Sequence, residues 1–229
     1  MLVLKNLDDN KIFSYLGYKK DKHILTEDVL ELVASCKEEI LKTARPKFLF
    51  SPTFDLRTYE NQLFADNLLL VGKNIKAHLN GCDRAVFLAV TIGIEIDRLI
   101  RTAEATNMAR AVVLDAVSNV AVEEAADIAE NQLRERLASK KEYLTGRFSP
   151  GYGDFPISFG RELLRYVDAA RRIGLSVTQS GIMTPRKSVS AVLGISKTKV
   201  CGKLATCENC VLREKCDLRK EGKSCGEAF

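Results

Sequence analysis

Residues 147–153, with the sequence RFSPGYG, bring a planar cation, a proline, two glycines and an aromatic ring into one short loop. Arg147 offers a fork of N–H donors that suits a carboxylate or a phosphate. Gly151 and Gly153 can adopt backbone angles closed to other residues, and they let backbone N–H groups come close to a ligand. Pro150 fixes its own φ angle. This loop is therefore the candidate ligand site of the chain.

A helix is expected to follow the loop, because apolar residues recur at helical spacing. Its apolar face is expected to comprise Leu163, Leu164, Val167, Ala170 and Ile173. Gly174 suits the position just after the end of this helix. Residues 175–196 are then expected to form a strand, a polar turn and a second strand.

The spacing of Arg147, Gly151 and Tyr152 is R-x-x-x-G-Y, which resembles the S-adenosylmethionine-binding motif in the activation domain of cobalamin-dependent methionine synthase. A later stretch resembles the second signature of that family. Its matching residues are Leu175, Thr178, Ser180, Met183, Pro185, Ser188, Val189 and Ser190. The two matches occur in the family's order, and a looser similarity extends back to about residue 80. Gly-Asp-Phe at residues 153–155 replaces the Pro-Ala-Cys that is usual in the large enzymes.

The resemblance implies that the chain binds S-adenosylmethionine and supports the reductive remethylation of cob(II)alamin. S-adenosylmethionine would supply the methyl group, and an electron donor such as flavodoxin or ferredoxin would supply the electron. Arg147 would pair with the ligand carboxylate, while Pro150, Gly151 and Tyr152 would contact the ligand. No catalytic residue is assigned, because the role of the protein would be to hold the sulfonium methyl over the cobalt.

Residues 108–138 are expected to form a long helix with an apolar stripe. The stripe comprises Ala109, Val112, Val113, Ala116, Val117 and Val120. One turn further on, it reaches Glu123 and Glu124, with Asn119 beside it. A carboxylate in an apolar helix face either pairs within the fold or lines a polar pocket. The related family has a glutamate at the position that resembles Glu123, so the resemblance adds Glu123 to the expected S-adenosylmethionine site.

Five of the seven cysteines lie near the C-terminal end of the sequence. Cys207 and Cys210 have the C-x-x-C spacing that lets two thiolates bind one metal. The segment around them is too short and too charged to bury a core, so a metal is a natural means of ordering it. We expect Cys201, Cys207, Cys210 and Cys216 to hold an iron–sulfur cluster or zinc, with Cys225 as an alternative ligand. Free or redox-active thiols are the other interpretation.

Length and composition are those of a globular protein, with 229 residues of which 46% are hydrophobic and 28% charged. Residues 1–200 are expected to form the activation-like domain and residues 201–229 the Cys-rich tail. A net charge of +5 is too small to indicate nucleic-acid binding. No apolar run approaches the ~20 residues that a membrane span needs. Cysteines without a secretory signal indicate a reducing cytoplasm.

The expected fold class is α+β, with a twisted, largely antiparallel sheet and helices packed against it. Residues 85–93 form an almost unbroken apolar run and are expected to be a central strand buried on both faces. Residues 47–59 are expected to be an edge or bulged strand, because Pro52 interrupts them. Helices are also expected over residues 8–17, from Thr26 to the stop at residues 45–46, and over residues 72–81.

No corrinoid-binding motif is recognisable, because Asp21-Lys22-His23 lacks the glycine expected three residues beyond the histidine. The sequence is also too short for folate and homocysteine domains. Docking in trans on a separate corrinoid-binding protein or split methionine synthase is therefore expected. One alternative is a relative that binds this partner without supporting the reaction. Another is a metal-stabilised module for binding protein or nucleic acid, which the interrupted basic run 213–223 fits weakly.

Overall fold

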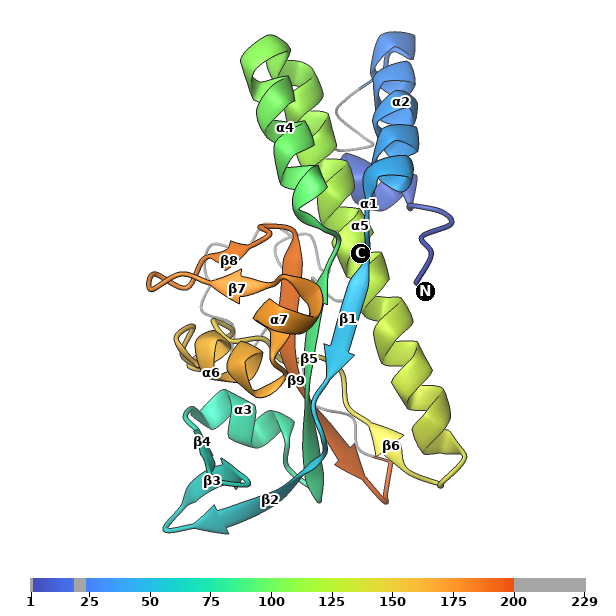
Figure 1. Ribbon diagram of the computed structural model, residues 1–229. Coiled ribbons are helices and arrows are strands. Elements are labelled where there is room, and N and C mark those ends of the chain that lie inside the picture. Colours follow the sequence, from blue (N-terminus) through green and yellow to red (C-terminus); the bar gives the residue numbers. More distant parts are fainter. Residues whose placement is uncertain (1, 19–23, 200–229) are drawn as a thin grey trace.

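The computed structural model describes residues 2–18 and 24–199 of the chain. The fold is α+β, as predicted, with one seven-stranded sheet and helices on both of its faces (Figure 1). The expected metal ligands Cys201, Cys207, Cys210 and Cys216, and His23, lie outside the described residues. The predicted boundary between residues 200 and 201 therefore stays a prediction.

The strands of the sheet run in the order β4-β3-β2-β5-β9-β6, and β1 also pairs with β5. Their bounds are β1 Lys47–Phe50, β2 Phe54–Tyr59, β3 Gln62–Ala65, β4 Leu68–Leu70, β5 Arg84–Thr91, β6 Tyr143–Leu144 and β9 Ser188–Ser196. A separate hairpin pairs β7 Ser176–Val177 with β8 Met183–Thr184. Every pairing among the described strands is antiparallel. The predicted largely antiparallel sheet is thus confirmed.

The centre of the sheet is the pair β5–β9, in register from Arg84↔Ile195 to Thr91↔Ser188. Alternate β5 residues face opposite cores, since successive side chains of a strand point to opposite faces. Val86, Leu88 and Val90 face one core, while Ala85, Phe87 and Ala89 face the other. The predicted central strand is therefore confirmed. The expected strand over residues 47–59 divides into β1 and β2 around Pro52, which has no N–H for a sheet hydrogen bond.

One face of the sheet is covered by three long helices and the short α1. Their bounds are α1 Asp9–Tyr15, α2 Glu27–Thr43, α4 Ile94–Thr106 and α5 Met108–Ala138. The predicted stripe of α5 is buried from Val113 onward, but Ala109 and Val112 are exposed. This part of the prediction is wrong because the first turns of α5 rise beyond the edge of the sheet (Figure 1), where the helix packs against α2 and α4 and buries Ala111, Val113 and Leu114 instead.

The opposite face carries α3 Lys73–His78, α6 Phe159–Tyr166 and α7 Ala169–Ile173. The single helix expected through residues 163–173 is interrupted at Asp168, whose φ is +52°. This interruption rotates the following residues, so Ala169 is buried and Ala170, which was expected on the apolar face, is exposed. Gly174 ends α7 with a left-handed φ of +70°, as predicted.

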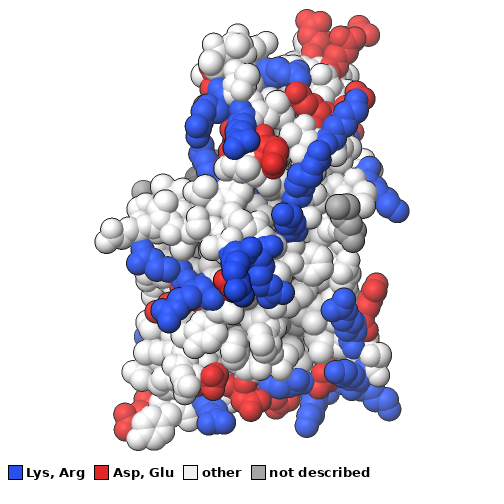
Figure 2. All heavy atoms as spheres, viewed as in Figure 1, with Lys and Arg blue, Asp and Glu red and all other residues white. Residues whose placement is uncertain are grey.

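Figure 2 shows one face of the molecule, on which basic side chains lie in separate groups from the top to the bottom of the view and most of the acidic ones lie toward its two ends. On this face the small positive net charge is thus not gathered into one continuous patch. Within the described ranges, no helix is at once long and apolar enough to cross a bilayer.

Candidate functional site

The backbone around Arg147 is held against β9 on both sides of that residue. Thr145 N–H donates to the Gly194 carbonyl at 2.9 Å, and Phe148 exchanges two 2.9 Å hydrogen bonds with Val192. The Phe148 side chain is buried in the core of the α3–α6 face. Because neighbouring side chains of an extended segment point in opposite directions, Arg147 points to the other side, towards α5.

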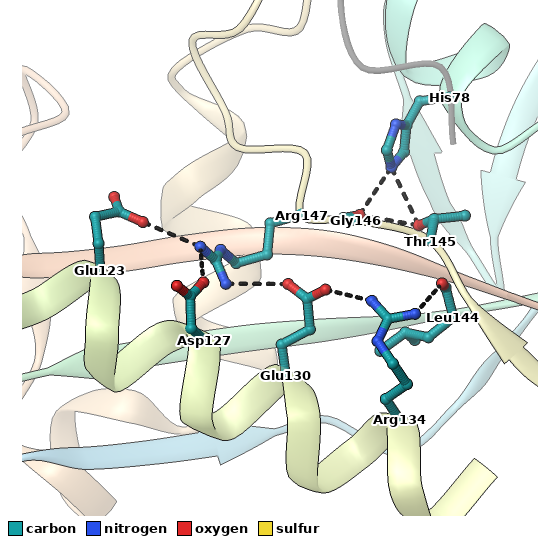
Figure 3. A network of polar contacts seen from close by, with 9 residues as sticks. All are labelled: His78, Glu123, Asp127, Glu130, Arg134, Leu144, Thr145, Gly146 and Arg147. Atoms are coloured by element: carbon teal, nitrogen blue, oxygen red, sulfur yellow. Dashed lines mark hydrogen bonds and ion pairs between the residues drawn. The ribbon is translucent and has the colours of Figure 1, made fainter. Parts of the chain in front are cut away.

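Arg147 meets a row of three carboxylates on α5 (Figure 3). Its Nη2 lies 3.0 Å from Glu123 Oε2 and 2.8 Å from Asp127 Oδ1, and its Nη1 lies 3.0 Å from Glu130 Oε2. The three acids share one helix face, because they are spaced by four and then three residues. Glu130 also pairs with Arg134 at 2.5 Å, and Arg134 donates to the Leu144 carbonyl at 2.8 Å. Arg147 and Glu123 are the two members of this cluster predicted from the sequence, whereas Asp127 and Glu130 come from the structure alone.

The acidic end of this cluster is open to solvent. The side chains of Glu123 and Asp127 are 40% and 43% exposed, whereas those of Arg147 and Glu130 are 18% and 14% exposed. Two arginines against three carboxylates leave a net charge of −1. Burial by itself lowers the pKa of Arg147, but the hydrogen bond and charge of Asp127 and the other two acids raise it overall. The guanidinium therefore stays charged, and the exposed carboxylates can accept a cationic group.

Two tyrosines, Tyr152 and Tyr15, lie near each other, and Tyr15 is also near Glu123. Tyr152 is 53% exposed and rests edge-to-face on Phe148, with ring centroids 5.9 Å apart. Burial, followed by the charge of Glu123 and then Tyr152, raises the pKa of Tyr15. Tyr15 of α1 therefore lies within electrostatic range of Glu123 and Tyr152. No local sequence pattern identifies Tyr15 as a neighbour of this site, because α1 is far from Glu123 and Tyr152 in the sequence.

The loop after Arg147 is closed by its own backbone hydrogen bonds. Gly151 has a left-handed φ of +96°, and its N–H donates to the Phe155 carbonyl at 2.8 Å. Tyr152 N–H donates to the Ser149 carbonyl at 3.0 Å. These two N–H groups are thus used within the loop. A ligand would therefore contact Gly151 at its carbonyl, or approach its Cα closely because glycine has no side chain.

The two signature stretches meet at α6. Gly160 lies between Pro150 and Ser190, and a Cβ built on it would lie 3.9 Å from each side chain. Gly181, in the turn between β7 and β8, approaches Ile157 in a similar way. The second signature therefore packs behind the loop of the first.

The Gly-Asp-Phe run at residues 153–155 joins the loop to α3 and to the core. A Cβ on Gly153 would overlap the Asn74 side chain, so only glycine fits without a shift. Asp154 accepts hydrogen bonds from the N–H groups of Lys73 at 2.6 Å and Asn74 at 2.9 Å. Phe155 is 1% exposed and packs on Phe159, with ring centroids 4.9 Å apart. The Gly-Asp-Phe run, which departs from the family pattern, therefore attaches the loop to the start of α3 and to the hydrophobic core.

Asp154→Asn is expected to weaken this attachment in a pH-dependent way. Although desolvation raises the pKa of Asp154, the backbone hydrogen bonds from Asn74 and Lys73 lower it below the ordinary value of 3.8. The contribution of Asp154 to stability is therefore present above about pH 4 and lost as the pH falls further. Melting temperatures of the two proteins between pH 7 and pH 3 should differ at neutral pH and converge in acid. A constant difference down to pH 3 would contradict this account.

A further ion pair continues the polar row of α5 towards its N-terminus. Lys187 Nζ lies 2.7 Å from both Asp115 Oδ1 and Asn119 Oδ1, and the lysine is 9% exposed. Of these three residues, Asn119 has a signal in the sequence, as a neighbour of the apolar stripe of α5, whereas Lys187 and Asp115 have none. This pair connects the start of β9 to α5.

Metal binding by the cysteine-rich tail stays a prediction. Within residues 2–18 and 24–199, no three His, Cys, Asp or Glu side chains are arranged to hold a metal. Elemental analysis of anaerobically purified protein should find either iron with sulfide or zinc. Cys36 is buried, and burial followed by the charge of Asp83 raises the pKa of Cys82 to about 11, so both thiols should react slowly at neutral pH. Absence of metal together with five rapidly titrating thiols in the folded protein would contradict the prediction.

Comparison with known proteins gives one family and one fold. Residues 73–201 match the family model described as vitamin B12 dependent methionine synthase, activation domain. Among solved structures, the crystal structure of the MetH reactivation domain bound to AdoHcy is similar, with a TM-score of 0.64 and 17% sequence identity. The similarity covers 97% of this chain and 83% of that one. No curated protein sequence matches the chain.

Proposed function

The chain belongs to the family of the vitamin B12 dependent methionine synthase activation domain, and on this premise we propose that it binds S-adenosylmethionine and supports the reductive remethylation of cob(II)alamin. The observation that carries the proposal is the pairing of Arg147, in the same loop as Tyr152, with a row of three carboxylates on α5. The corrinoid would be carried by a separate corrinoid-binding protein or split methionine synthase. An electron donor of the flavodoxin or ferredoxin type would complete the system.

The charges of the ligand complement those of the cluster. S-adenosylmethionine carries a carboxylate, an ammonium and a sulfonium, so its net charge is opposite to the −1 of the arginines and acids. The three acids use at most three of the five N–H groups of Arg147, so within the described residues at least two remain for a ligand carboxylate. Glu123 and Asp127, the exposed acids, are suited to the ligand ammonium.

The protein contributes by positioning the ligand rather than by acid–base chemistry. Cobalamin supplies the methyl acceptor, and methyl transfer from the sulfonium makes an otherwise unfavourable one-electron reduction irreversible. Arg147 would hold the amino-acid end of the ligand with a charged hydrogen bond of about 1.5–3 kcal/mol. The ring of Tyr152 near the sulfonium would add about 0.5–2 kcal/mol. Fixing both ends orients the methyl group towards the approaching corrinoid.

Calorimetric titration with S-adenosylmethionine tests the proposal directly. Binding is expected in roughly the micromolar range, equivalent to about −8 kcal/mol. S-adenosylhomocysteine, the product of methyl transfer and the AdoHcy seen in the similar crystal structure, should compete. Absence of both heat and thermal shift at millimolar ligand would overturn the proposed function. In a second step, remethylation should require the chain, an added corrinoid protein and an electron donor together.

Glu123→Gln is expected to weaken ligand binding while leaving the melting temperature nearly unchanged. Glu123 is partly exposed, and Arg147 keeps two other carboxylates, so the fold loses little when one charge is removed. The ligand ammonium, in contrast, would lose one charged partner, which costs roughly 0.5–1.5 kcal/mol. Parallel titration and thermal melting check this. A large fall in melting temperature with intact binding would instead identify Glu123 as a structural carboxylate.

A further inference from the structure

We propose that His78, at the end of α3, is a positioning residue that sets the direction in which Arg147 presents its guanidinium to a ligand carboxylate. This inference rests on the proposed function, and it concerns a residue outside both signature stretches. His78 is 1% exposed, and its Nε2 lies 3.0 Å from the Gly146 carbonyl oxygen and 3.1 Å from Thr145 Oγ1 (Figure 3). It therefore contacts the residue immediately before Arg147.

The acceptors around His78 define which of its nitrogens carries the proton. A carbonyl oxygen can only accept, so the contact with the Gly146 carbonyl requires Nε2 to be the N–H donor. Thr145 Oγ1 donates to the same carbonyl at 2.9 Å and accepts from Gly194 N–H at 2.8 Å. The Gly146 carbonyl thus receives two donors, and Thr145 connects them to the central strand β9.

These hydrogen bonds hold the peptide unit that lies between the two contacts with β9 at Thr145 and Phe148. A Cβ built on Gly146 would have no atom within 4 Å, so side-chain packing at this position does not help to hold it. The carbonyl of Gly146 and the N–H of Arg147 belong to one planar peptide. A donor that fixes this carbonyl therefore fixes the orientation of the Arg147 backbone, and with it the direction in which the side chain leaves.

The other end of α3 holds the far side of the same loop. Asp154 accepts from Lys73 and Asn74 N–H, and Gly153 packs against the Asn74 side chain. The six residues of α3 span about 9 Å. This short rigid element contacts the chain just before Arg147 and just after Tyr152. It therefore sets the spacing between the residues that would hold the two ends of the ligand.

Packing alone is the competing explanation for His78, since its ring also lies 5.0 Å from that of Phe148. The two explanations predict different ligand selectivity. If His78 only fills space, replacing it should weaken every ligand equally. If it orients Arg147, replacing it should weaken only ligands that carry the carboxylate.

The test compares S-adenosylmethionine with its decarboxylated analogue by calorimetry on wild-type protein, His78→Leu and His78→Gln. Wild-type protein should prefer S-adenosylmethionine at least about tenfold, since the analogue cannot make the charged hydrogen bond with Arg147. His78→Leu should reduce this preference to less than about threefold, with little change in affinity for the analogue. His78→Gln should restore most of it, because the glutamine amide can donate to the Gly146 carbonyl.

Different outcomes would contradict the role of His78 and the proposed function. A wild-type protein that binds neither compound contradicts the proposed function. Wild-type binding without preference, an unchanged preference in His78→Leu, or an equal loss for both ligands would overturn the role of His78. If His78→Leu does not fold, His78→Met replaces it, because methionine also lacks an N–H donor for the Gly146 carbonyl. Its preference for S-adenosylmethionine should fall in the same way.

Discussion

Arg147→Ala should weaken S-adenosylmethionine binding at least tenfold. The ligand carboxylate would lose a charged hydrogen bond of about 1.5–3 kcal/mol, which corresponds to roughly 10–150-fold in the dissociation constant. Removing the guanidinium also leaves the carboxylates of Glu123, Asp127 and Glu130 together on one helix face, where Arg134 pairs with Glu130 alone. Their repulsion would further disturb the site. Arg147→Lys should be intermediate, because an ammonium keeps the charge but loses the planar fork.

Calorimetric titration at a temperature well below the melting point of each variant measures this effect. The matched control is Arg110→Ala, which removes an ion pair with Glu39 of comparable burial. Arg110 lies about 25 Å along α5 from Asp127. Its replacement should leave ligand affinity unchanged. Wild-type affinity in Arg147→Ala would show that Arg147 has only a structural role.

Phe155→Ala should lower stability and ligand affinity together. The side chain is fully buried against Phe148 and Phe159, so its loss leaves a cavity and costs about 3–5 kcal/mol. For a domain of this size, that is a fall of roughly 6–20 °C in melting temperature. Because Phe155 directly follows Asp154, the loop would also lose its main apolar contact with the core. Tyr152 would then no longer be held in one place.

Ile40→Ala provides the comparison, because Ile40 is equally buried but belongs to the opposite core. Both substitutions should reduce the melting temperature by similar amounts. Only Phe155→Ala should weaken S-adenosylmethionine binding when both variants are fully folded at the temperature of measurement. Equal affinities in the two variants would show that the core contact of Phe155 does not position the loop.

The sequence alone determined the elements whose signal lies in consecutive residues. The apolar run 85–93 identified the central strand, and helical spacing identified α3 and the long α5. The R-x-x-x-G-Y spacing located the loop of the candidate site, and the family match to residues 73–201 agrees with the resemblance. These predictions succeed because periodicity and turn residues act over a few neighbouring positions.

Tertiary structure decided which side chains meet. Arg147 lies on the α5 side of the sheet because Phe148 pairs with Val192 and occupies the opposite face, and no local pattern specifies that register. The same register brings Asp127 and Glu130 into contact with Arg147. His78 contacts Gly146, which is 68 residues away in the sequence. The left-handed φ at Asp168 likewise interrupts a stretch whose apolar spacing is helical throughout, so periodicity alone does not reveal the break. Long-range pairing depends on the simultaneous placement of several elements, so this part of the site becomes defined only when the chain has folded.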